Sequence, residues 1–250
     1  MPIASETLLL TFLAFCRIGG CLVLMPGFSS ARIPTQVRLL LAVAVTLALA
    51  PLLLPGLQEA RGQATADQTV KLLVSETAIG LLIGLLARIF FIALEFGATA
   101  IAMSIGFNNM IGMAVDDYEQ MPVVASFITL SATLLFFLAD QHWEVLRALL
   151  GSYAALPVDS LFASDFAMAR LTRTLSDAFL LALQIASPFI VYSFIVNMMF
   201  GIINKLTPQI PVYFISQPFV LAGGFLLVYF TIAEFLQIFI AAFTSWLRHG

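Results

Sequence analysis

The chain has 250 residues, of which 61% are hydrophobic and only 10% are charged. A soluble domain has about 45–50% apolar and about 25% charged residues, and it needs the polar residues to cover its surface. The net charge of −3 lacks the basic excess of a nucleic-acid-binding protein. The composition therefore excludes a typical cytosolic enzyme, a disordered chain and a nucleic-acid binder, and it predicts a single-domain integral membrane protein.

Apolar runs of sufficient length to cross a bilayer follow one another along the chain. About 20 apolar residues in a helix cross the hydrocarbon core. Six candidate segments reach that length: 7–31, 39–58, 72–107, 120–139, 178–204 and 206–233. The amphipathic stretch between 140 and 177 predicts a short surface helix. We therefore predict an all-α fold of about six long apolar helical segments.

Prolines and glycines lie inside or at the ends of these runs, at depths where lipid offers no hydrogen-bond donor. Proline removes a backbone N–H and frees a carbonyl one turn earlier. Such breaks are tolerated only where protein or water surrounds the helix. We expect the helices to be buried against other subunits more than against lipid. The expected breaks are at Pro51, Pro55, Pro188, Pro218 and the pair Gly223-Gly224.

Arg17 is the most costly residue to place in a membrane-spanning helix. An arginine at the bilayer centre costs about 2.5–3.5 kcal/mol on insertion scales. Three interpretations stay open: an ion pair with an acid such as Glu76, Glu95 or Glu234 or one from a neighbouring subunit, a place in a conducting pathway, and snorkelling to the interface. Arg88 and Glu95 share a helix face, which fits a structural network or a proton relay. We assign Arg17, Arg88 and Glu95 to structural charge pairing.

Gly80 and Gly84 lie four residues apart in the segment 72–107. Small residues at this spacing let two helix backbones approach closely in a membrane. The pattern predicts tight helix packing rather than chemistry.

No motif in the chain predicts catalysis, a cofactor or a metal. The sequence has two histidines, His142 and His249, and it contains no H-E-x-x-H, G-x-S-x-G, P-loop or dinucleotide-binding motif. Two cysteines, Cys16 and Cys21, are too few for a disulfide framework. We predict no enzymatic activity, no cofactor and no metal site.

The segment from Gly106 to Pro122 joins two apolar runs, and its sequence is typical neither of a polar turn nor of a helix. It contains three methionines, two glycines and a pair of asparagines, a composition that can repack. Two interpretations stay open: an ordered re-entrant loop, and a movable constriction that closes a pore by apolar contact. In the second, the plug residues are Phe107, Asn108, Asn109, Met110, Ile111, Gly112 and Met113.

Three stretches together resemble one known family. They are PGFSSARIP followed by RLLLA within 26–42, the stretch from His142-Trp143 to Pro157, and NKLTPQIPVYFI at 204–215. The third stretch carries the hairpin motif residues Pro208 and Gln209, and Pro218 follows it. In this order, and over nearly the whole chain, they resemble the FliR family of flagellar export-gate subunits, which includes the equivalent subunit of virulence type III secretion systems.

The resemblance implies a structural, pore-forming subunit that assembles with FliP-like and FliQ-like subunits and with an FlhB-like subunit. The assembly would pass unfolded proteins across the bacterial inner membrane at the flagellar basal body, in contact with lipid and without nucleic acid. Within one domain, 1–250, about 1–177 would pack like FliP and about 178–250 would form a FliQ-like helical hairpin. Much of the core would sit raised out of the bilayer plane, and Phe107 to Met121 would plug the closed pore.

A small-solute secondary transporter is the alternative function. Its helices would break at Pro188 and Pro218 around a site near the bilayer midplane. The internal repeat expected of such a transporter is absent, because the two halves of the chain do not share a pattern of breaks. The sequence therefore favours the export-gate subunit.

Overall fold

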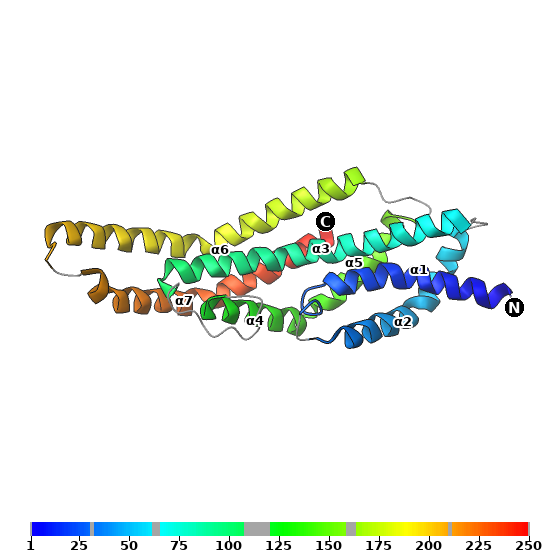
Figure 1. Cartoon of the computed structure of the whole chain (residues 1–250), viewed down its shortest axis with the longest axis horizontal. Helices are drawn as coiled ribbons and strands as arrows, with labels where there is room; N and C mark the ends of the chain where they lie inside the picture. Colours follow the sequence, from blue (N-terminus) through cyan, green and yellow to red (C-terminus); the bar gives the residue numbers. More distant parts are fainter. Residues whose placement is uncertain are drawn as a thin grey trace. The chain divides into compact units, whose positions relative to one another are not determined.

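The computed structural model describes residues 2–30, 33–61, 66–107, 121–158, 164–209 and 212–249. Within these ranges the chain is all-α and contains no strand, which confirms the predicted fold class. Figure 1 colours the helices in chain order. They are α1 (Pro2–Leu24), α2 (Thr35–Arg61), α3 (Ala66–Ser104), α4 (Val123–Leu138), α5 (Gln141–Ala155), α6 (Ser164–Leu206) and α7 (Val212–His249).

Five of these helices, α1, α2, α3, α6 and α7, are long and apolar enough to cross a membrane. The helices α4 and α5 meet at a bend of 67° and count as a sixth span only if they are one broken crossing. The bend lies beside Asp140, which has a φ of 54° in the left-handed region. The predicted span 120–139 is therefore shorter than expected, because α4 has only 16 residues.

The expected proline breaks do not end any helix among the described residues. Pro51 and Pro55 lie inside α2, Pro188 lies inside α6 and Pro218 lies inside α7. At Pro188 a side chain supplies the missing donor: the Ser187 hydroxyl donates to the Gln184 carbonyl, which the proline leaves free, at 2.8 Å. The stretch 140–177, in which the sequence predicted one short surface helix, contains the short helix α5 and the beginning of α6.

The chain divides into two compact units. Unit 1 contains Met1–Ile89, Asp140–Leu175 and Leu247–Gly250, and unit 2 contains Phe90–Ala139 and Ser176–Trp246. The helices α3, α6 and α7 contribute residues to both units. The division into a FliP-like part and a FliQ-like hairpin stays a prediction.

Unit 1 is built around α1. This helix packs beside α2 (Figure 1). Its inward face buries Leu10, Leu13, Ile18 and Cys21 completely. One charged side chain, Arg17, is buried on the same helix. Among the residues that the structure describes, the core of unit 1 therefore buries Arg17 and the acid Glu76 within a largely apolar environment.

Unit 2 has an aromatic core contributed by α3, α4 and α7. The Phe91 ring meets Phe136 and Phe239 edge to face, with ring centroids 5.6 and 5.3 Å apart. Phe243 meets Phe90 and Phe136 in the same way, at 5.7 and 5.6 Å. Edge-to-face contacts place the positive edge of one ring against the negative face of another, so they add to the energy of apolar burial.

Candidate functional site

The most distinctive polar group in unit 1 is the guanidinium of Arg17. Its side chain is 0% exposed, and the Glu76 side chain is 1% exposed. Burying either charge alone would cost several kcal/mol, so each requires the other close by. The structure places them in direct contact.

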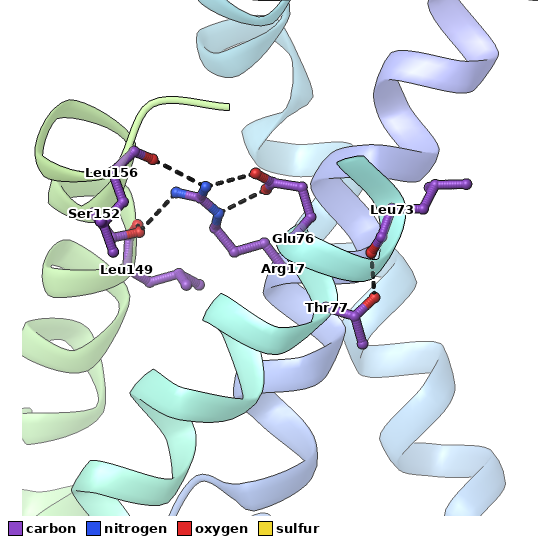
Figure 2. A network of polar contacts seen from close by, with 7 residues as sticks. All are labelled: Arg17, Leu73, Glu76, Thr77, Leu149, Ser152 and Leu156. Carbon is purple, nitrogen blue, oxygen red and sulfur yellow. Dashed lines mark hydrogen bonds and ion pairs between the residues drawn. The ribbon is translucent and has the colours of Figure 1, made fainter. Parts of the chain in front are cut away.

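Arg17 and Glu76 form a bidentate ion pair between α1 and α3 (Figure 2). The Arg17 Nε donates to Glu76 Oε2 at 2.6 Å, and Nη2 donates to Glu76 Oε1 at 2.6 Å. This side-on geometry matches the planar guanidinium to the planar carboxylate, which makes it the strongest form of such a pair. Of the acids named as candidate partners in the sequence, the structure places Glu76 there.

The helix α5 supplies the remaining acceptors of Arg17 (Figure 2). Nη1 donates to the Ser152 hydroxyl oxygen at 3.2 Å, and Nη2 donates to the Leu156 carbonyl at 3.1 Å. Ser152 is oriented for this role because its own hydroxyl donates to the Leu149 carbonyl at 2.6 Å. The Leu156 carbonyl follows the end of α5, where the helix dipole favours a cation.

An aromatic ring also contacts the guanidinium of Arg17. The Tyr153 ring centroid lies 4.0 Å from the central carbon of the Arg17 guanidinium, within the range of a cation–π contact. Arg17 of α1 therefore binds Glu76 of α3 and three residues at the end of α5. We call this group, Arg17, Glu76, Ser152, Tyr153 and Leu156, the arginine clamp.

Glycines bring the backbones of α1 and α3 close enough for the clamp to form. A Cβ at Gly80 would overlap the backbone carbonyl of Arg17, and a Cβ at Gly84 would lie 2.5 Å from the carbonyl oxygen of Cys21. On the opposite helix, a Cβ at Gly20 would lie 3.0 Å from the Thr77 carbonyl oxygen. Gly80 lies one helical turn after Glu76, so the close approach and the ion pair occur at the same point of α3.

Replacing Gly80 by Ala is expected to force α1 and α3 apart and to destabilise unit 1 by about 1–3 kcal/mol, the usual cost of overpacking. The measurement is thermal unfolding of the protein purified in detergent together with the subunits that co-purify with it. Gly56→Ala is the matched control, because nothing lies within 4 Å of a Cβ there and alanine favours a helix over glycine. Equal unfolding temperatures for Gly80→Ala and the unchanged protein would contradict the close approach.

The other predicted charge-pairing residues, Arg88 and Glu95, lie on α3, and both are half-buried. The hydrogen bonds of Arg17 go to Glu76, Ser152 and Leu156. A role of Arg88 and Glu95 in charge pairing stays a prediction.

Of the predicted plug residues, the structure describes Phe107, in the turn that follows α3. Its ring meets the Phe225 ring of α7 edge to face, with centroids 5.4 Å apart. Asn108 to Met113 lie outside the described residues. Phe107, the first of the predicted plug residues, is therefore packed against α7 within unit 2.

The hairpin motif lies around the connection of α6 to α7. Pro208 and Gln209 follow the end of α6 in a turn and are exposed, whereas Pro218 lies in the second turn of α7 and is also exposed. No group of three His, Cys, Asp or Glu side chains that could hold a metal occurs in the part of the chain that the structure describes.

The fold and the clamp together define a class: a helical integral membrane protein with several long apolar helices and a charged pair sealed inside one unit. Similarity to known proteins identifies the family within this class. The chain belongs to the family of bacterial export proteins, family 1, whose sequence profile matches residues 8–246.

Curated relatives agree with this family. The chain is 28% identical to the flagellar biosynthetic protein FliR of Caulobacter vibrioides over 210 residues, which cover 82% of this chain and 81% of that protein. It is 26% identical to the FliR of Escherichia coli K12, over 86% of this chain and 81% of that protein. The FliR of Aquifex aeolicus is 26% identical over 90% of this chain and 86% of that protein. These similarities confirm the resemblance that the three sequence stretches indicated.

Proposed function

We propose that the chain is a structural, pore-forming subunit of the flagellar protein export gate. The observation that carries the proposal is the family match over residues 8–246. It is supported by relatives named flagellar biosynthetic protein FliR, which align with this chain over most of their own length. The subunit would work in the bacterial inner membrane at the flagellar basal body. The secondary-transporter alternative is not favoured by this family membership.

The exposed apolar surface of α6 supports assembly with partner subunits. Large apolar side chains are exposed from Phe166, at 42%, to Leu206, at 76%, along a helix of 43 residues. About 20 residues of helix cross the hydrocarbon core of a bilayer, and tilting extends this length only modestly. Lipid alone therefore covers about half of this surface, and we infer that FliP-like, FliQ-like and FlhB-like subunits cover the rest.

The pore in this proposal is closed by the plug, residues 107–113. Apolar and methionine side chains can close a narrow pore by excluding water, and they can repack when a substrate displaces them. The packing of Phe107 on Phe225 supports a plug that begins at a fixed point on α7. The passing substrates would be unfolded flagellar proteins, and the energy for export would come from other parts of the apparatus.

The arginine clamp has a structural role in this proposal. It fixes α1, α3 and α5 to one another inside unit 1, because one guanidinium binds residues of the other two helices. The Arg17 side chain is 0% exposed and is paired with Glu76, which supports a structural role rather than a place in a conducting pathway. We assign Arg88 and Glu95 to structural pairing as well, and we propose no catalytic residue, cofactor or metal.

Co-purification tests the proposal. We expect an affinity-tagged copy of the chain, expressed with the FliP- and FliQ-like proteins of the same organism, to purify in detergent as one large complex that contains all three. Expressed alone, it should be unstable or aggregate, because its apolar faces lack their partners. A stable monomer that transports a small solute in liposomes would contradict the gate and favour the transporter.

A further inference from the structure

Arg88 lies on the outward face of α3, in the part of that helix that belongs to unit 1. Val74, Leu81 and Arg88 follow one another at intervals of seven residues, so they share one face of the helix. Val74 is 65% exposed and Leu81 is 38% exposed. The clamp residue Glu76 and the close-packed Gly80 lie on another face, toward α1. The half-buried Arg88 therefore belongs to an apolar surface that this chain leaves uncovered.

Arg88 has no hydrogen-bond acceptor and no ion-pair partner among the residues that the structure describes. Three other bases of unit 1 each have an acid as partner: Arg17 pairs with Glu76, Lys71 with Asp67 and Arg147 with Glu144. These acids are therefore already engaged. An arginine side chain stays protonated in proteins and carries five N–H donors. The acceptors of Arg88 must therefore come from a neighbouring molecule.

Lipid headgroups are too far from Arg88 along α3 to supply these acceptors. Toward the beginning of α3 the exposed apolar residues extend to Val74, about 21 Å of helix from Arg88. Toward its end they extend to Met103, which is 53% exposed and about 22 Å from Arg88. Both distances exceed half of the about 30 Å thickness of the hydrocarbon core. Lipid covering this surface would therefore leave Arg88 deep in the hydrocarbon, where an unpaired arginine is disfavoured.

We propose that the outward face of α3 around Arg88 docks an apolar helix of a partner subunit, and that one Asp or Glu of that helix binds the Arg88 guanidinium. A carboxylate fits the planar guanidinium through two parallel hydrogen bonds. Charge complementarity selects the partner, because a helix without an acid at this depth would leave Arg88 buried and unpaired. The structural pairing assigned to Arg88 is then made between subunits. The inference rests on the proposed assembly with partner subunits and names the chemistry of one contact in it.

The variant Arg88→Met tests the inference, because methionine keeps a long side chain and removes the charge. It leaves the partner's carboxylate buried without its cation, so we expect the yield of co-purified complex to fall about tenfold or more. Arg147→Met is the matched control: Arg147 is a base of the same unit, it is 73% exposed, and its loss should leave the yield unchanged. Each Asp and Glu within the apolar helices of the co-purifying subunits is then changed to Leu, one at a time. One of these substitutions should restore the yield of Arg88→Met.

The same experiment separates this inference from the proposed function. If the unchanged chain co-purifies with the partner subunits and Arg88→Met gives an equal or higher yield, the gate subunit stands and the docking contact is wrong. An arginine that faces lipid or water would give that result, because its removal unpairs no acid. A fall in yield that no partner substitution restores would also overturn the inference, since the loss then arises within this chain. If the unchanged chain does not co-purify with the other subunits, the proposed function fails and the inference falls with it.

Discussion

Arg17→Ala is expected to abolish most of the assembled complex. The substitution leaves the Glu76 carboxylate buried at 1% exposure without its cation, and it removes every hydrogen bond that joins α1 to α5 through the guanidinium. Breaking one side of a buried ion pair costs about 3–5 kcal/mol. This is a large part of the about 5–15 kcal/mol that stabilises a folded domain. The measurement is the amount of complex that co-purifies with the partner subunits.

Two further variants distinguish loss of the charge from loss of the pair. Arg17→Met combined with Glu76→Met should recover much of the yield, because no unpaired charge is then buried. Arg147→Ala should leave the yield unchanged, since the Arg147–Glu144 pair lies on the surface, with Arg147 73% exposed, and such pairs contribute at most about 1 kcal/mol. Normal complex yield with lost export in Arg17→Ala would place Arg17 in the export path instead.

The clamp could be predicted from the sequence only in part. The cost of a buried arginine requires a partner, and the sequence offered Glu76 among several acids. Gly80 and Glu76 are one helical turn apart, so the packing motif marked the same point of α3 as the ion pair. Ser152 and Leu156 could not be found in this way. They are 135 and 139 positions from Arg17, and one of them acts through a backbone carbonyl that carries no sequence signal.

The fold, like the clamp, could be predicted from the sequence only in part. Composition and apolar runs predicted an all-α membrane protein, because burial of apolar residues is a property of long segments. Whether a proline interrupts a helix depends on the side chains next to it, and the spacing of apolar residues gives no information about them. At Pro188 the hydroxyl of Ser187 satisfies the freed carbonyl of Gln184, and α6 continues over 43 residues. Likewise, Gln217 is one polar residue in an apolar run, and only the structure shows that its side chain donates to the Gly106 carbonyl.

Deleting Met110 to Asp116 is expected to leave assembly intact and to make the membrane leaky to small solutes. The clamp and the aromatic core of unit 2 lie outside this segment, so the contacts that stabilise the described helices remain. A pore closed by apolar side chains conducts ions once they are removed, so we expect the leak to rise about tenfold or more. Ion permeability of cells that produce the complex, normalised to the amount of purified complex, measures the effect.

A variant that keeps the chain length separates side-chain closure from a general distortion. Met110→Ser, Ile111→Ser and Met113→Ser together should also cause a leak, because hydroxyl groups admit water where methionine and isoleucine exclude it. Val70→Ser is the control, since Val70 is 60% exposed near the beginning of α3 and lies outside both the plug and α6. Permeability that stays at the level of the unchanged complex in both plug variants would remove the plug from residues 107–113. The segment would then be an ordered re-entrant loop, and the closure of the pore would have to come from the partner subunits.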